Sequence, residues 1–213
     1  MSTPPPLVRT RSLPRWTYGL LFVLLVAVPF LGKLMWSAGG EEEALATLAE
    51  LGAELPHRPL RAAELDQPLE THDGQHTTLR ALMASGEIVI LHFWASWCPP
   101  CMEELPGIGQ LAHSLADRRA RVVSVSHDDA WPEADAALVK TIGRAQPLAG
   151  VWLREPEGQA GDPGKMLRIK LGTEKLPETY ILGHGQVLAR LIAGQPWANP
   201  RLLRALEHLA PAR

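Results

Sequence analysis

Short apolar runs alternate with amphipathic stretches along most of the chain. The densest run, Ile88-Val89-Ile90-Leu91, has the length and the β-branched content of a buried strand. Similar runs predict further strands, and apolar residues spaced three or four apart predict helices. The predicted strands cover 67–71, 87–94, 121–126, 150–153, 178–182 and 186–192, and the predicted helices cover 78–84, 98–116, 133–143, 164–171 and 199–209. Strands that alternate with helices and end in a hairpin favour an α/β domain with a mixed sheet.

A longer apolar segment lies near the N-terminus. Trp16 to Gly32 carries no charge, and as a helix of 17 residues it would be ~26 Å long, close to the minimum span of a bilayer core. Arginines 9, 11 and 15 precede it and favour a cytoplasmic N-terminus. We predict a single-pass signal-anchor at 16–36. The small residues Ser37-Ala38-Gly39 leave a cleavable signal peptide as the alternative, and both interpretations export the rest of the chain.

These patterns divide the chain into four segments. They are a cytoplasmic tail at 1–15, the transmembrane segment at 16–36, a helical linker at 37–57 and a globular domain at 58–213. In the linker, leucines 45, 48, 51 and 55 have helical spacing, which predicts a spacer helix that lifts the domain off the membrane. A stripe that binds a partner protein is the alternative.

Charge excludes one class of function. The chain has 21 basic and 23 acidic residues, and its first 40 residues hold four of the basic ones and none of the acidic ones. Residues 41–213 therefore carry 17 basic and 23 acidic side chains, a net charge of −6. With no basic patch and no ladder of aromatic residues, the sequence does not predict a nucleic-acid binder.

Candidate chemistry is concentrated in the only two cysteines, Cys98 and Cys101. They form a C-x-x-C motif where a predicted strand turns into a helix, an arrangement typical of a dithiol/disulfide redox site. Cys98 falls at the helix N-terminus, where free N–H groups and the helix dipole stabilise a thiolate. Cys101 lies one turn later, close enough to form a disulfide with Cys98 and to act as the resolving thiol.

Other interpretations of the two cysteines are weaker. An inert core pair would not explain the flanking Trp97, Pro99 and Pro100. A zinc site needs about four ligands, and the sequence has no second C-x-x-C or C-x-x-H motif. A thiol pair that carries copper with a distant histidine remains open. A peroxide-reducing thiol is disfavoured, because those enzymes usually carry Thr where this chain has Ala95.

Pro99 and Pro100 bear on the redox poise. Neither has a backbone N–H, so two donors that could stabilise the Cys98 thiolate at the helix start are missing. A less stabilised thiolate predicts a lower reduction potential and a reducing protein. The alternative is that proline is simply favoured in a first helical turn.

At this point four segments resemble the thioredoxin-like family, and within it the membrane-tethered TlpA/ResA/CcmG (DsbE) group of thiol-disulfide oxidoreductases. They are Asp73-Gly74-Gln75 with Thr78-Leu79, Phe93 to Cys101 with Glu104-Leu105-Pro106, Val122 to Ser126, and Leu176 to Leu182 with Gly183-His184-Gly185. The resemblance covers about residues 58–210. It implies a thioredoxin-like α/β fold, with a central mixed β-sheet flanked by helices, after an N-terminal transmembrane helix.

The resemblance also implies roles for individual residues. Cys98 would be the more exposed cysteine, and Pro177 would be a cis-proline that lets the Leu176 backbone pair with a substrate peptide. Glu104 would lie near the cysteines and tune their proton transfers; a solvated helix glutamate is the alternative. Trp97 would offer a flat contact surface beside the disulfide, and Pro99 and Pro100 would also border the substrate.

His92 departs from the family pattern, which has Asp or Asn at this position. Its place in the strand puts it beneath the dithiol, where it could take the proton of Cys101. A hydrogen-bonded core histidine is the equal alternative.

The resemblance implies a function as well: reduction of protein disulfides outside the cytoplasm by an enzyme anchored in the cytoplasmic membrane. The substrates would be proteins with disulfides, such as apocytochrome c during cytochrome c maturation. A membrane thiol donor would supply electrons, and no cofactor or metal beyond the Cys98–Cys101 disulfide is expected. The alternatives are an oxidant or isomerase of secreted proteins and a non-catalytic copper metallochaperone.

Overall fold

A computed structural model describes residues 22, 28–84, 86–143, 149–155, 163–210 and 212–213, and of residues 28–38 it describes the backbone alone. The chain divides into two units, Met1–Gly40 and Glu41–Arg213. Helix α2 (Val28–Glu50) belongs partly to each unit. The predicted membrane segment at 16–36 lies mostly outside the described residues. Within the described part of the chain, no helix combines the length and the apolar character needed to cross a bilayer.

The second unit is built on one mixed sheet. In the described residues this sheet has eight strands in the order β1-β8-β7-β4-β5-β6-β2-β3. Strands β4, β5 and β6 are parallel, and every other neighbouring pair is antiparallel. The strands are β1 (Arg58–Pro59), β2 (Leu69–Thr71), β3 (His76–Thr77), β4 (Ile88–Trp94), β5 (Ala120–Ser126), β6 (Val151–Arg154), β7 (Glu178–Gly183) and β8 (Gln186–Ile192). The predicted mixed sheet is confirmed.

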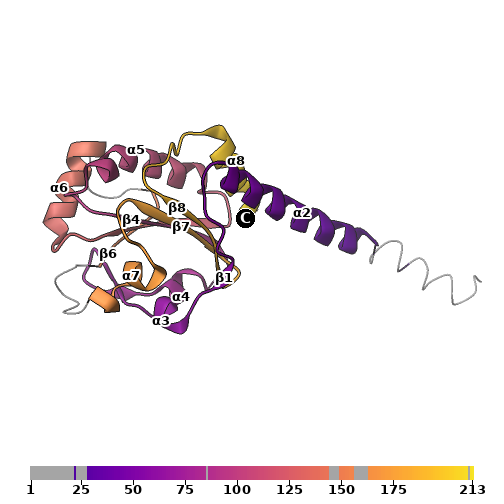
Figure 1. Ribbon diagram of the computed structural model, residues 1–213, viewed down its shortest axis with the longest axis horizontal. Helices are drawn as coiled ribbons and strands as arrows, with labels where there is room; N and C mark the ends of the chain where they lie inside the picture. The colour runs from indigo at the N-terminus through magenta and orange to yellow at the C-terminus, as the bar shows by residue number, and fades with distance from the viewer. Residues whose placement is uncertain (1–21, 23–27, 85, 144–148, 156–162, 211) are drawn as a thin grey trace, which may run out of the picture. The chain divides into compact units, whose positions relative to one another are not determined.

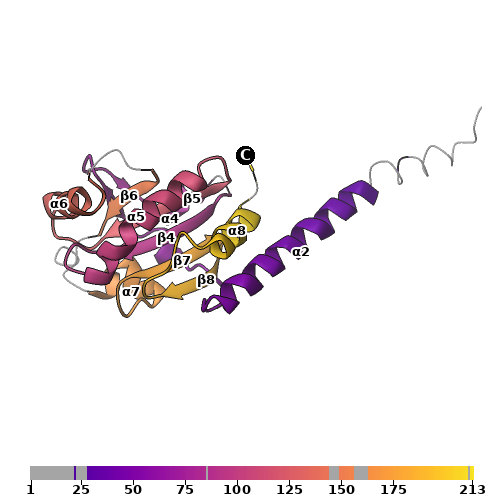
Figure 2. The ribbon, with the colours of Figure 1, turned by 90° about the horizontal axis from the view of Figure 1, so that it is seen from above.

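Helices cover both faces of the sheet (Figures 1 and 2). Helices α5, α6 and α8 lie on one face, and α3, α4 and α7 lie on the other. A hydrophobic core lies on each face of the sheet, and alternate residues of the central strand β4 point into the two cores. Ile88 and Ile90 belong to the core under α5, and Val89 and Leu91 belong to the core on the opposite face. The helices are α3 (Ala62–Leu65), α4 (Leu79–Leu82), α5 (Pro99–Ser114), α6 (Trp131–Ile142), α7 (Leu167–Leu171) and α8 (Pro200–Leu209), with a 3₁₀ turn at Pro163–Lys165.

The C-terminal part of the predicted spacer helix packs on the domain. Ala44, Leu45 and Leu48 are buried in the core on the α5 side of the sheet. After α2 ends, the backbone of Glu54 exchanges two hydrogen bonds of 2.8 Å with Arg190 of β8. Leu45 and Leu48 therefore lie in a helix, as predicted, whereas Leu51 and Leu55 follow its end, and the domain itself covers the apolar face of all four. The compact unit begins at Glu41, before the predicted boundary at residue 58.

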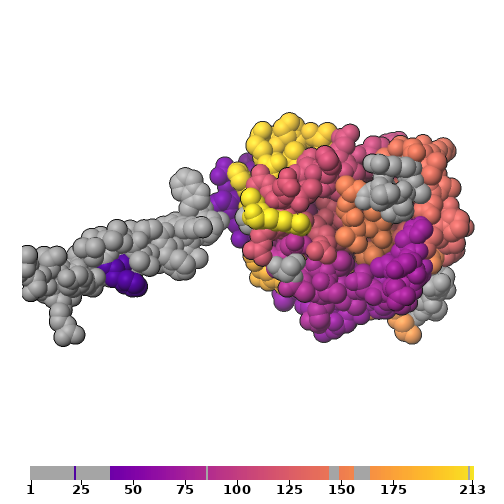
Figure 3. Space-filling model, turned by 180° about the vertical axis from the view of Figure 1, so that it is seen from behind, coloured from indigo at the N-terminus to yellow at the C-terminus, as the bar shows by residue number. Residues whose placement is uncertain are grey.

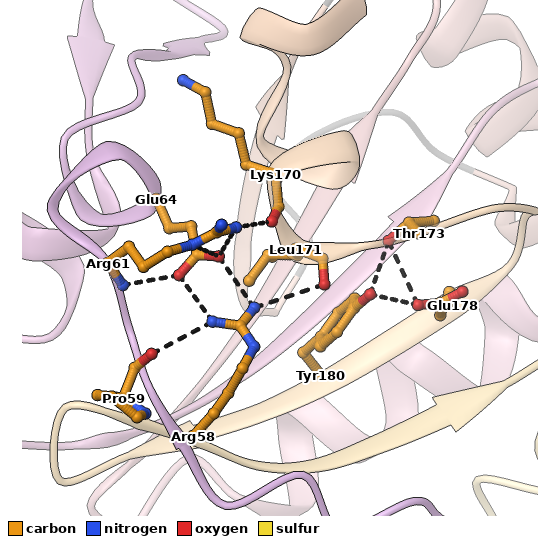
Figure 4. Close-up of polar contacts among 9 residues, drawn as sticks. All are labelled: Arg58, Pro59, Arg61, Glu64, Lys170, Leu171, Thr173, Glu178 and Tyr180. Atoms are coloured by element: carbon orange, nitrogen blue, oxygen red, sulfur yellow. Dashed lines mark hydrogen bonds and ion pairs between the residues drawn. The ribbon is translucent and has the colours of Figure 1, made fainter.

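Ion pairs tie the short N-terminal and C-terminal elements to the domain. Glu64 of α3 is fully buried, and its carboxylate accepts hydrogen bonds from Arg58 and Arg61, which also donate to the carbonyls of Leu171 and Lys170 on α7 (Figure 4). At the other end of the chain, Arg213 pairs with Glu87 at 3.1 Å, where the yellow C-terminal residues in Figure 3 lie against the body of the domain.

Candidate functional site

Cys98 and Cys101 form a disulfide at the start of α5. Cys98 is the N-cap of the helix, and Pro99 and Pro100 occupy its first turn, where a missing backbone N–H costs nothing. The Cys101 N–H donates to Cys98 Sγ at 3.3 Å. Cys98 is 5% exposed and Cys101 is fully buried. Cys98 is therefore the more exposed of the two cysteines, as the resemblance implied.

A buried carboxylate holds the loop that leads into the helix. Asp128, which follows β5, accepts hydrogen bonds from the backbone N–H of Ser96 at 3.1 Å and from its hydroxyl at 2.5 Å. The Ser126 hydroxyl donates to the same carboxylate at 2.6 Å. Because Asp128 is 1% exposed, these hydrogen bonds form away from water and fix the approach to Cys98.

The pairing register of the sheet brings the segment from Leu176 to Leu182 close to the cysteine motif. His92 pairs with Thr179 and Phe93 pairs with Glu178, so the start of β7 lies beside the end of β4. The Leu176–Pro177 bond just before β7 is cis, as the resemblance implied. The Pro177 carbonyl accepts a hydrogen bond from Ala193 N–H at 3.0 Å. Within the described residues, the backbone N–H and C=O of Leu176 make no hydrogen bond.

Glu104 lies one turn after Cys101 and is buried, with 6% of its surface exposed. Its Oε1 accepts hydrogen bonds from the Gln195 backbone N–H and from Trp197 Nε1 at 3.1 Å. Burial raises the pKa of Glu104 to about 7, although both hydrogen bonds oppose that shift. The alternative of a solvated helix glutamate is thereby excluded. A carboxyl group with this pKa can both take up and release a proton near neutral pH.

His92 is fully buried on the strand that precedes the dithiol. Its Nδ1 lies 2.9 Å from Thr179 Oγ1, and its ring meets the ring of Trp197 edge-on with centroids 6.3 Å apart. Burial lowers the pKa of His92 to about 3. With this pKa the imidazole is too weak a base to take a thiol proton efficiently near neutral pH, which favours the core-histidine interpretation over the general base.

The aromatic residues beside the motif differ in exposure. Trp97 is 58% exposed, so its ring is free to form a contact surface next to Cys98. Pro99 and Pro100 are exposed as well. Trp94, three residues earlier, is fully buried and meets Trp152 edge-on.

A second polar cluster anchors the loop that presents Leu176. Glu178 is buried and accepts hydrogen bonds from the hydroxyls of Thr173 and Tyr180 (Figure 4). It also accepts one from Arg190. Arg190 also donates to the carbonyl of Gly172 at 3.0 Å. Both ends of the segment 172–178 are thus tied to β8.

Sequence reasoning missed three residues of this site. Trp197 and the Gln195 amide reach Glu104 from the loop after β8, and Asp128 reaches Ser96 from the end of β5. The signals were a tryptophan inside a loop of Gly and Pro, and an acidic residue at the carboxyl end of a predicted core strand. Neither signal indicates which residue is contacted, because each contact joins residues at least 32 positions apart.

Comparisons with known proteins agree with this geometry. The model of the AhpC/TSA family matches residues 60–189. The thiol:disulfide interchange protein DsbE of Yersinia pestis is 29% identical over 80% of this chain and 79% of its own length. DsbE of Escherichia coli K12 is 27% identical over 86% and 85%.

A solved structure of a putative DsbE from Chlorobium tepidum shares the fold, with a TM-score of 0.55 and 23% identity over 72% of this chain and 99% of that one. The predicted thioredoxin-like architecture is thus confirmed. With a Cys98–Cys101 disulfide on that scaffold, this chain belongs to the AhpC/TSA family of thioredoxin-like proteins and is a thiol-disulfide oxidoreductase related to thiol:disulfide interchange proteins of the DsbE type.

Proposed function

We propose that this protein reduces disulfides of exported proteins from the outer face of the cytoplasmic membrane, and that apocytochrome c is its main substrate. The observation that carries the proposal is the Cys98-Pro99-Pro100-Cys101 motif at the start of α5, with Cys98 the more accessible of the two cysteines. The DsbE-type relatives support the activity. The Pro177-Glu178-Thr179-Tyr180 run, which resembles the cytochrome-maturation members, supports the substrate.

In the proposed reaction the reduced protein transfers two electrons to its substrate. The Cys98 thiolate attacks one sulfur of the substrate disulfide, forms a mixed disulfide and releases the first substrate thiolate. The Cys101 thiol then loses its proton, and its sulfur attacks Cys98 Sγ. This step releases the second substrate thiolate and closes the Cys98–Cys101 disulfide. A membrane thiol donor returns two electrons to the pair, and the cycle needs no metal or organic cofactor.

Glu104 is the group that we propose accepts the Cys101 proton. It is buried on the same face of α5, one turn away, and its pKa of about 7 matches the task. The neutral His92, with a pKa of about 3, is a far weaker proton acceptor.

Substrate recognition is proposed to combine backbone pairing and an aromatic contact. The N–H and C=O of Leu176, which make no hydrogen bond within the described part of the chain, offer an extended substrate segment the hydrogen bonds of one strand residue. The exposed ring of Trp97 supplies apolar contact beside Cys98. Neither contact selects a particular side chain, so they suit an unfolded polypeptide.

Anchoring rests on the sequence. The uncharged stretch from Trp16 to Gly32 and the arginines before it support a single-pass anchor with the domain on the extracytoplasmic side.

The experiment that tests the direction of electron flow is the reduction potential of the Cys98–Cys101 pair, measured by equilibration with defined thiol buffers. We expect about −250 mV or lower, near the thioredoxin end of the scale. A value above about −180 mV would mean an oxidant or isomerase of secreted proteins instead. Reduction of a disulfide-bonded C-x-x-C-H peptide then tests the substrate.

A further inference from the structure

The two carboxylate oxygens of Glu104 have unequal surroundings. Oε1 accepts hydrogen bonds from the Gln195 N–H and from Trp197 Nε1, the latter at 3.1 Å. Oε2 is also buried, but it has no hydrogen-bond partner among the described residues. Both donors belong to the loop between β8 and α8, so a distant part of the chain decides how this carboxylate is held.

This asymmetry fixes where a proton can reside. A backbone amide and an indole N–H are donors only, so Oε1 must accept from both whether or not Glu104 is ionised. A proton on Oε1 would point at two donor hydrogens and be repelled by them, whereas no donor hydrogen lies at Oε2 within the described residues. We propose that Trp197, together with the Gln195 amide, is a positioning residue that fixes Oε2 as the proton-carrying atom of Glu104. The inference rests on the proposed role of Glu104 as proton acceptor for the dithiol.

Packing against α5 holds the Trp197 indole close to the Glu104 carboxylate. The Trp197 side chain is 4% exposed, and it lies directly against Gly107 of α5. A Cβ on Gly107 would come within 3.0 Å of Trp197 Cβ and 3.3 Å of its Cδ1. Gly107 therefore leaves room for the indole to reach Glu104, one turn earlier on the same helix. On its other side the ring meets His92 edge-on.

Among the described residues, few other titratable groups can affect the pKa of Glu104. His92 of β4 faces Trp197, and burial lowers its pKa so that it stays neutral. The Cys98–Cys101 disulfide precedes Glu104 on α5 and does not titrate while oxidised. Glu103 is exposed, and on α8 Arg201 is paired with Glu50. In the oxidised protein, burial and the two N–H donors therefore determine the pKa of Glu104.

Trp197→Phe isolates the indole donor, because it keeps an aromatic ring and removes the N–H. A hydrogen bond to a charged group favours the ionised form, so its loss should raise the pKa of Glu104 by about one unit. The measurement is a ¹³C NMR titration of glutamate carboxyl carbons in the oxidised full-length protein. The Glu104 signal is assigned by its absence in Glu104→Gln.

Trp94→Phe is the matched control. Trp94 is also buried, but its Nε1 has no hydrogen-bond partner within the described residues. The same loss of an indole N–H at this position should leave the Glu104 titration unchanged. An upward shift in Trp197→Phe alone supports the inference, and equal titrations in the two variants overturn it.

Gly107→Ala provides a second test that keeps the indole. The added methyl group should push Trp197 away from Glu104 and raise the pKa of Glu104 in the same direction. If Trp197→Phe does not fold, an unshifted Glu104 in Gly107→Ala overturns the inference. The NMR titration needs no turnover, so it is independent of disulfide reduction assays. Failure of the wild-type protein to reduce disulfides would overturn the proposed function and leave this titration interpretable.

Discussion

Cys98 and Cys101 differ in access, since solvent reaches only the first. We therefore expect Cys101→Ser to accumulate a mixed disulfide between Cys98 and a substrate peptide, because no second thiol can resolve it. Cys98→Ser should form no such adduct. The measurement is intact-protein mass spectrometry after incubation with a disulfide-bonded peptide. Adducts on Cys101 in the Cys98→Ser protein would reverse the assigned roles.

The pH dependence of mixed-disulfide resolution distinguishes Glu104 from His92 as the proton acceptor. In the wild-type protein the rate of mixed-disulfide resolution should rise with pH through an inflection near 7, where Glu104 ionises. Glu104→Gln should remove this inflection and slow the step by about 10²-fold, the low end for general acid–base catalysis. His92→Asn should keep it, because His92 remains neutral above pH 3 or so. Stopped-flow measurements across pH 5–9 separate the two, and loss of the inflection in His92→Asn would reassign the base.

Local residue patterns explain what was predicted at this scale. The cysteines, the prolines between them and Pro177 lie within short motifs whose chemistry is visible in sequence. The contacts of Glu104 with Trp197 and of Ser96 with Asp128 are different. They depend on which loops meet after folding, and no periodicity in the sequence encodes that meeting.

Among the elements, β8 supports the segment that presents Leu176. Arg190 of β8 pairs with the buried Glu178 and holds the Gly172 carbonyl. Arg190→Gln should leave the carboxylate buried without its charge partner and lower the free energy of unfolding by about 3 kcal/mol. The exposed pair Arg201–Glu50 gives the control, since Arg201→Gln should cost less than about 1 kcal/mol. Urea unfolding measures both, and equal losses would contradict the role of Arg190.

Most elements were predictable because each carries its own signal. Strands β4, β5, β7 and β8 are apolar runs, and α5 begins at a Cys-Pro-Pro sequence. The sequence did not reveal β1, β3 or α3, which have two to four residues and form only because the rest of the domain holds them. The leucine stripe at 45–55 predicted a helix that in fact ends at Glu50, and it did not predict that the surface covering the leucines is the domain's own core.

For the whole molecule, buried titratable groups predict an unusual pH dependence of stability. Burial lowers the pKa of His92 and His127 to about 3, so stability should rise with pH between about 3 and 6.5. Burial raises the pKa of Glu104 and Glu155 to about 7. Below that value the folded state holds protons that the unfolded state has released, so stability should fall between about 4.5 and 7.

The two trends should cancel where they overlap. We expect urea midpoints that rise from pH 3 to 4.5, stay level to about 6.5 and fall slightly by pH 7. The double variant His92→Asn/His127→Asn should lose the histidine contribution, so its midpoints should fall steadily between pH 4.5 and 7. A wild-type curve that kept rising through pH 6.5 would show that the two glutamates are not protonated in the folded state.

The edges of the sheet have a consequence for behaviour at high concentration. In the described residues both edge strands, β1 and β3, are only two residues long, and Pro59 lies in β1. Long unpaired edges recruit other chains into aggregates, and short edges interrupted by proline do not. We therefore expect the domain to stay free of edge-to-edge self-association, even when it is crowded by unfolded polypeptides that would readily add a strand to a longer edge.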